Sequence, residues 1–203
     1  MYFSDIAAGV RPELLAGLQR LWSVMAAPGT WWSGAERVAI AMAARGDEPG
    51  SLPTTAAGAA RTIYADITST SRDWVESLVE AGLPMPAFVE IIGIVSRLAA
   101  VDEFTRALGV PLEPLPAPGT GEPSRLPAPP ARPGRLWVPT VGAMSITNAL
   151  SLVPAESAAQ ADIHGPLYMS YEQMADYAFE RELNRAQMEL VAARVSAINE
   201  CFY

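Results

Sequence analysis

The sequence predicts an all-α protein, and three observations support this fold class. Apolar residues in the first half of the chain recur at the three- and four-residue spacing of helices. Serines that can cap a helix and glycines that can end one bracket several of these stretches. No stretch alternates apolar and polar residues for long enough to indicate a strand.

The first two helices are expected in "RPELLAGLQRLWSVMAA" and "SGAERVAIAMAARG". In the first stretch Pro12 suits an opening turn, because its missing N–H group would have no partner there. The second stretch opens with Ser33 and has Glu36 three residues later, which is the pattern of a capping box. Gly46 fits the end of the same helix, since glycine readily adopts the left-handed conformation found there.

Three more helices are expected before the middle of the chain. "TTAAGAARTIYADI" has the weakest helical pattern of the three. In "SRDWVESLVEAG", Ser71 is the expected cap and Gly82 the expected end. A long apolar helix is expected from about Pro86 to Leu108.

Residues 111–133 contain nine of the 18 prolines. Proline neither continues a helix nor donates a backbone hydrogen bond, so this stretch is either an extended linker or an arm that wraps the surface. It divides the chain into a helical N-terminal domain at 1–110, a linker at 111–134 and a C-terminal domain at 135–203.

The C-terminal part contains two expected helices. One runs from Ser170 to about Phe179, and the other is capped by Asn184, with Gln187 at its third position. His164 is the single histidine and stands beside a Gly-Pro pair. It is expected in a loop or a cap rather than as a ligand.

Composition narrows the function classes. A net charge of -8 and a pI near 4.7 argue against a nucleic-acid partner, which would require a basic face. No apolar run approaches the roughly 20 residues needed to span a bilayer, so no membrane association is expected. The N-terminus lacks the pattern of a signal peptide, so the expected location is the cytoplasm. One cysteine excludes an intramolecular disulfide and a cysteine-based metal cluster.

Cys201 and Glu189 are the candidate catalytic residues. A lone cysteine commonly packs as a small apolar side chain, but it becomes a redox thiol where a positive group lowers its pKa. A glutamate in a helix is commonly a solvated surface residue, but a buried one has a raised pKa and can transfer protons. The residue types alone do not decide whether Cys201 and Glu189 have structural or catalytic roles.

The segment "NRAQMELVAARVSAINECFY" resembles the core motif of the carboxymuconolactone decarboxylase and alkylhydroperoxidase D-like family. In that family a helix carrying a glutamate leads, about a dozen residues later, into Cys-x-x-Cys followed by histidine. Glu189 matches the proton-relay glutamate, and Cys201, twelve residues later, matches the first cysteine. "FVEIIGIVSRLAAVDEFTRALGVPLEPLP" also resembles a helix of the family, with Glu90, Arg106 and Gly109 in matching places.

The resemblance is incomplete. The second cysteine would follow Tyr203, and neither it nor the histidine is present. We therefore expect the motif to be cut, either at a selenocysteine codon read as a stop or by truncation. "ERVAIAMAARGDE" at 36–48 aligns weakly with 189–201. The resemblance thus implies two tandem cores, of which the first is degenerate and has no cysteine.

The implied activity of the intact protein is antioxidant reduction of hydroperoxides by a thiol or selenol, impaired in this chain. The implied partners are a small-molecule hydroperoxide, a thiol reductant and further copies of the chain, with no cofactor or metal. A single thiol cannot complete a dithiol cycle by itself. A straight helix would hold Glu189 and Cys201 about 18 Å apart, so a working site requires a break near Asn199. Two alternatives stay open: decarboxylation of a lactone acid, and a non-catalytic helical scaffold.

Overall fold

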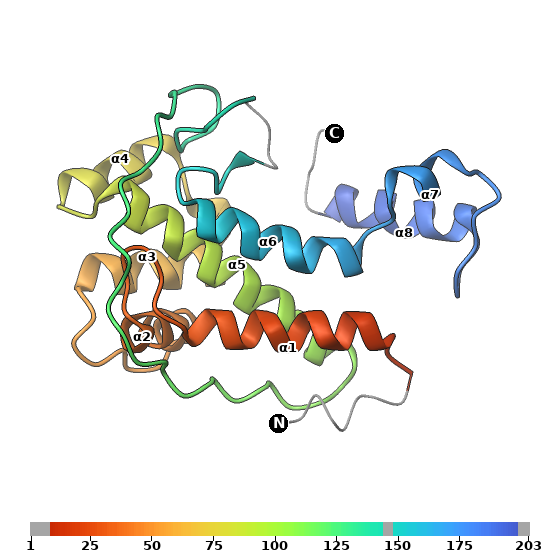
Figure 1. Ribbon diagram of the computed structural model, residues 1–203, viewed down its shortest axis with the longest axis horizontal. Coiled ribbons are helices and arrows are strands. Elements are labelled where there is room, and N and C mark those ends of the chain that lie inside the picture. The colour runs from red at the N-terminus through yellow and green to blue at the C-terminus, as the bar shows by residue number, and fades with distance from the viewer. Residues whose placement is uncertain (1–8, 144–147, 199–203) are drawn as a thin grey trace. The chain divides into compact units, whose positions relative to one another are not determined.

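The computed structural model describes residues 9–143 and 148–198 (Figure 1). Over these residues the chain forms eight α-helices and no strand, which confirms the all-α prediction. In chain order the elements are α1 (Pro12–Ala26), α2 (Gly34–Arg45), α3 (Thr54–Ala65), the 3-10 helix η2 (Ile67–Ser69), α4 (Arg72–Glu80), α5 (Met85–Ala107), α6 (Pro154–Leu167), α7 (Tyr171–Ala175) and α8 (Arg185–Ile198). None of the helices described is long and apolar enough to cross a membrane.

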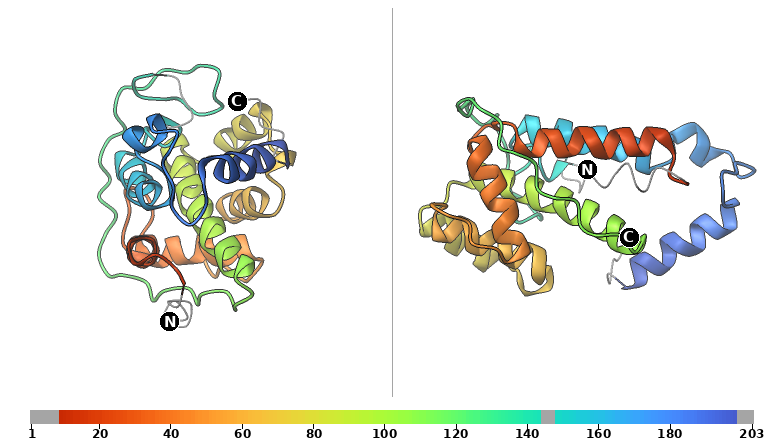
Figure 2. Two further views of the ribbon diagram at one scale, coloured as in Figure 1. Left: turned by 90° about the vertical axis from the view of Figure 1, so that its right-hand side faces the viewer. Right: turned by 90° about the horizontal axis from the view of Figure 1, so that it is seen from below.

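The chain forms two compact units, one that extends to His164 and one that begins at Gly165. In the first unit α5 is the central helix and contacts α1, α2 and α3 (Figure 2). Its apolar residues point in every direction around its axis, which is the pattern of a helix covered on all sides. The core also includes large side chains from the surrounding helices, among them Trp22, Ile40 and Val75.

The predicted helix caps are confirmed. Ser33 and Glu36 form the capping box of α2, and Gly46 follows that helix with φ of 90°. Ser71 caps α4 by accepting a hydrogen bond from the backbone of Trp74 at 3.1 Å. These local signals place the helix ends within one or two residues of their expected positions.

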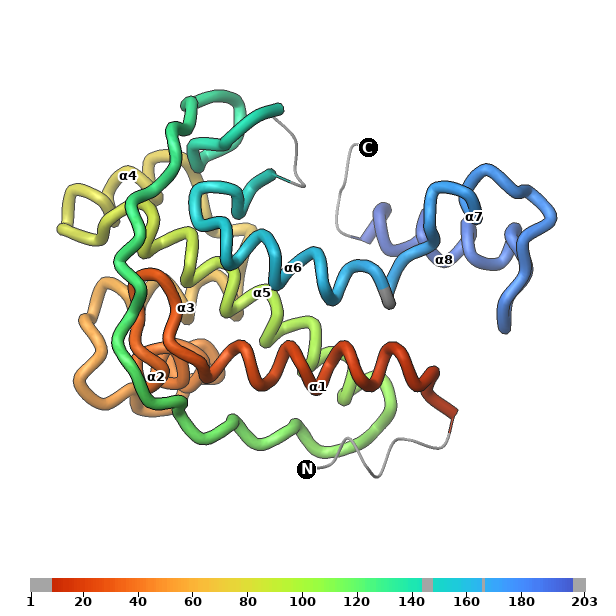
Figure 3. The backbone as a smooth tube through the Cα atoms, viewed as in Figure 1, coloured from red at the N-terminus to blue at the C-terminus, as the bar shows by residue number. Residues whose placement is uncertain are grey.

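The proline-rich segment 111–133, called the arm below, follows the surface of the first unit as an extended chain (Figure 3). The indole Nε1 of Trp22 donates to the carbonyl oxygen of Pro114 at 2.9 Å. Farther along, the backbone N–H of Arg125 donates to the carbonyl oxygen of Thr30, also at 2.9 Å. The second of the two expected conformations, an arm that wraps the surface, is therefore the one observed.

The boundary between the compact units differs from the expected linker at 111–134. Residues after the arm pack with the helices before it: Leu152, just before α6, and Ile163, within α6, are both buried in the core of the first unit. Proline favours an extended backbone. An extended segment can still be held on the surface by hydrogen bonds, so it need not separate two domains. The reading of 135–203 as a second core remains a prediction.

Two local predictions after the arm are wrong. The helix that begins after Ser170 ends at Ala175 rather than near Phe179, because Asp176 adopts an extended backbone and its side chain accepts from the N–H of Ala178 at 2.9 Å. His164 lies in the last turn of α6 rather than in a loop. The alanines of this helix favour helical structure, and their preference outweighs the turn signal of the Gly-Pro pair.

Candidate functional site

Glu189, one of the two predicted catalytic residues, lies on α8 in the second unit. Asn184 caps this helix as predicted, since its Oδ1 accepts from the N–H of Gln187 and the Gln187 side chain accepts from the N–H of Asn184, each at 3.0 Å. One turn before Glu189, the Arg185 guanidinium lies 2.7 Å from its carboxylate. The Glu189 side chain is 57% exposed, so it is not a buried glutamate.

The pair of Arg185 and Glu189 lines a cavity of about 460 Å³ within the second unit. Most of the other lining side chains are apolar and include three methionines, Met169, Met174 and Met188. Methionine is flexible and polarisable, so such a wall adapts to apolar molecules of different shapes.

Two arginines give this cavity its positive charge. Arg185 is only 19% exposed and lies over the Tyr177 ring at 6.0 Å. Arg181 also lines the cavity and donates to Gln173 Oε1 at 3.0 Å. These contacts hold both guanidinium groups in place, and a thiol brought to this cavity would meet the positive charge that favours a thiolate.

Cys201 lies outside the described residues, as does Asn199, where a break in the last helix is expected. The distance between Glu189 and Cys201 therefore stays a prediction. Among the residues that are described, no group of three or more histidine, cysteine, aspartate or glutamate side chains could hold a metal ion.

Glu36, the glutamate of the first unit that matches Glu189, has a structural role. Its Oε2 accepts from the N–H of Ser33 at 2.8 Å and from the Ser33 hydroxyl at 2.7 Å. The carboxylate therefore stabilises the start of α2 by satisfying donors that have no partner within the helix.

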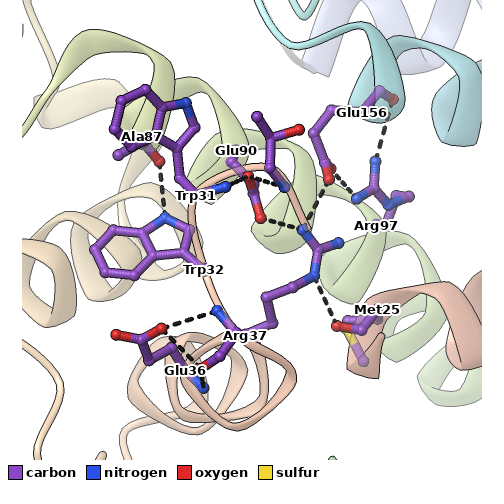
Figure 4. A network of polar contacts seen from close by, with 11 residues as sticks. Met25, Trp31, Trp32, Glu36, Arg37, Ala87, Glu90, Arg97 and Glu156 are labelled. Carbon is purple, nitrogen blue, oxygen red and sulfur yellow. Dashed lines mark hydrogen bonds and ion pairs between the residues drawn. The ribbon is translucent and has the colours of Figure 1, made fainter. Parts of the chain in front are cut away.

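A cluster of four charged side chains is buried in the first unit (Figure 4). Arg37 of α2 is central: its Nη1 donates to Glu156 Oε1 at 2.8 Å and also contacts Glu90, and its Nε donates to the Met25 carbonyl at 3.1 Å. Arg97 of α5 contacts the other oxygen of Glu156. The four charges balance, which is the condition under which buried ions are tolerated.

Glu90 is fully buried, and backbone donors supplement its ion pair. Its Oε2 accepts from the N–H groups of Thr30 and Trp31 at 3.0 and 2.8 Å. Burial raises the pKa of Glu90 above its ordinary value, and the charge of Arg37 and the Trp31 hydrogen bond oppose this rise. Burial also works to lower the pKa of Arg37, but the two carboxylates outweigh it and the pKa is raised. The cluster therefore links α2, α5 and α6 by ion pairs.

A second polar group surrounds Asp102 of α5. Arg45 donates to both oxygens of this buried carboxylate, at 3.0 and 2.6 Å, and the Tyr64 hydroxyl donates to it at 2.6 Å. Burial and the hydrogen bond to Asp102 raise the pKa of Tyr64. The same arginine donates to the carbonyl of Glu113 at 3.0 Å, so this group also fastens the arm.

None of these buried charges was expected from the sequence to form an ion pair. A local signal existed for Glu90, which stands within the continuous apolar stretch "FVEIIGIV". A charge in such a stretch requires a partner, because burial of an unpaired ion is costly. No comparable signal exists for Glu156, which is separated from Arg37 by 119 positions.

No protein-family model matches the chain, and no curated protein or solved structure shows significant similarity to it.

Proposed function

We propose that the protein is an oxidoreductase of the alkylhydroperoxidase D-like kind, which reduces hydroperoxides at Cys201 with Glu189 as the proton-transfer residue and whose turnover is impaired by its single thiol. The observation that carries this proposal is that the Arg185–Glu189 pair lines a cavity of about 460 Å³ in the second unit, on the helix that precedes Cys201 in sequence. A base, a positive charge and an apolar wall are what a peroxidatic thiol and an organic hydroperoxide need.

The proposed reaction is a two-electron transfer. The Cys201 thiolate attacks the terminal peroxide oxygen, the O–O bond breaks, and the departing alkoxide takes a proton to become the alcohol. The thiol is oxidised to a sulfenic acid and the hydroperoxide is reduced. An external thiol then forms a mixed disulfide with release of water, and a second external thiol restores Cys201.

The roles of the two charged residues differ in this reaction. Arg185 favours the thiolate by its positive charge, and Glu189 exchanges protons with the thiol and the leaving oxygen. Because Glu189 is more than half exposed, it can exchange protons with water between reactions. External thiols supply both reducing equivalents, since the sequence contains a single cysteine.

The rate of Cys201 oxidation by an organic hydroperoxide tests the proposal. A site adapted to this reaction should oxidise at least about 100-fold faster than free cysteine, because of its thiolate and its proton-transfer group. A Cys201 thiol that reacts no faster than free cysteine would contradict the proposed activity.

A second candidate is a non-catalytic scaffold that associates through α8. Four apolar side chains of this helix are at least half exposed: Leu190, Val191, Val195 and Ile198. Exposed apolar surface of this kind is typical of protein association sites. An inert thiol in a chain that forms oligomers through α8 would favour this function over the peroxidase.

A further inference from the structure

We propose that the first unit binds a compact apolar ring compound, of one or two fused rings, in a second cavity. This cavity has a volume of about 270 Å³ and lies between α3, η2, α4, α5 and the segment that follows the arm. It is independent of the proposed thiol site, because all of its lining residues belong to the first unit, whereas Glu189 lines a cavity in the second.

The chemistry of the lining favours an aromatic guest. Trp74 of α4, Phe88 of α5 and Trp137 present aromatic rings, and nearly all the remaining wall is aliphatic. The Trp74 and Phe88 rings pack edge to face, with centroids 5.8 Å apart and planes at 72°. Aromatic rings favour such angled or offset contacts with one another. A flat ring bound in the cavity can therefore make a contact of the same kind with Trp74 or Phe88.

Water is a poor occupant of this space. A buried water normally makes two to four hydrogen bonds. The side chains that line the cavity offer polar atoms only at Thr70, at the exposed Arg135 and at the indole N–H groups of Trp74 and Trp137. Binding of an apolar compound is favourable because its apolar surface leaves water. Such a compound does not need the hydrogen-bond partners that the walls lack.

The volume limits the size of the guest. A cavity of about 150 Å³ lined by aliphatic and aromatic side chains accommodates benzene, so about 270 Å³ leaves room for a second fused ring. A helix from a partner protein, about 10 Å across with its side chains, is far too large. The volume therefore excludes a whole helix and fits a small molecule.

The wall formed by the chain after the arm is held in place. Arg72 Nη2 donates to the carbonyl oxygens of Gly134, Arg135 and Leu136 at 3.0, 3.2 and 3.1 Å. The next residue is Trp137, whose side chain lines the cavity although the residue is 46% exposed. A half-exposed tryptophan beside a fixed wall is suited to cover one face of a bound ring.

Calorimetric titration of the full chain with 1-naphthol tests this inference. We expect saturable binding of one molecule per chain. Trp137→Ala should weaken binding at least about five-fold through loss of an aromatic contact. Ile92→Trp should abolish binding, because the added ring fills the cavity. Val24→Ala is the control, since Val24 is an exposed residue of α1 that does not line the cavity.

Circular dichroism identifies variants that fail to fold, and Trp137→Ala keeps the test valid if Ile92→Trp does not fold. Absence of saturable binding to the wild type would overturn the proposal. So would equal affinity of the wild type and a folded Trp137→Ala variant. Binding of the linear alcohol n-octanol as tightly as 1-naphthol would overturn the preference for rings.

Discussion

Arg37 of α2 donates a hydrogen bond of 2.8 Å to Glu156 of α6, although 119 positions separate the two residues in the sequence. The proline-rich arm lies between them in sequence, so this buried contact joins the chain before the arm to the chain after it. Both side chains are almost fully buried. The first unit is therefore held together by charge as well as by its apolar core.

Replacing Arg37 with methionine should strongly destabilise the first unit. Arg37→Met leaves Glu90 and Glu156 buried with one positive charge instead of two, and removing one partner of a buried ion pair costs about 3–5 kcal/mol. Urea denaturation near neutral pH measures the loss. Arg61→Met is the matched control, because Arg61 is an exposed residue of α3 and its loss should change stability by less than about 0.5 kcal/mol.

The destabilisation by Arg37→Met should be smaller at about pH 5 than at about pH 7. Burial already raises the pKa of Glu90, and loss of Arg37 removes the charge that opposes this rise. A carboxyl group with a raised folded-state pKa binds more protons in the folded chain than in the unfolded chain. Its contribution to stability therefore grows as the pH falls through the folded-state pKa. An equal or larger loss at the lower pH would contradict the assignment of the buried charges.

Two helical glycines should respond oppositely to alanine. A Cβ atom at Gly93 of α5 would overlap the Glu156 carboxylate, so Gly93→Ala should cost about 1–3 kcal/mol. Gly58 of α3 has open space around the same position, and Gly58→Ala should stabilise by about 0.5–1 kcal/mol. Thermal denaturation of both variants measures the two changes. Equal effects would show that Glu156 does not lie against α5.

Self-association should depend on α8. Leu190 is 71% exposed, and we expect Leu190→Glu to shift the chain from oligomer toward monomer, because a charge disfavours burial in an apolar interface. Sedimentation velocity over a range of protein concentrations measures the shift. Val24→Glu on α1 is the control and should leave association unchanged. A wild-type chain that stays monomeric at every concentration would exclude an interface on this helix.

Helices could be predicted from the sequence where the signals for their ends are local. Ser33 with Glu36, Ser71 and Asn184 each act within one turn of chain, so the residue pattern contains all that determines the cap. The helix α6 was not predicted, because its alanines form no apolar stripe and its buried Glu156 is determined by distant arginines. The buried charges could not be paired from sequence for the same reason.

The candidate site was predicted only in part. Glu189 was identified through its resemblance to a family motif, but its ion pair with Arg185 and the methionine-lined cavity depend on how α7 and α8 fold together. The cavity proposed to bind ring compounds had no sequence signal, since its walls come from residues spread between Ile63 and Ala149.

Glu189→Gln should slow oxidation of Cys201 by about 100-fold, the usual size of a proton-transfer contribution. The amide keeps the size of the side chain but cannot take up a proton. Stopped-flow oxidation by cumene hydroperoxide measures the rate, and Glu182→Gln, in the exposed loop before α8, is the control. An unchanged rate in Glu189→Gln would remove Glu189 from the mechanism.

The amount of hydroperoxide reduced per chain, measured together with labelling of the sulfenic acid by dimedone, tests the proposed activity most directly. Without an external thiol, we expect one equivalent of hydroperoxide to be reduced to its alcohol and one label to appear, at Cys201. Cys201→Ser should abolish both. No labelling of Cys201, or equal hydroperoxide reduction by Cys201→Ser, would contradict the proposal that this protein reduces hydroperoxides through its thiol.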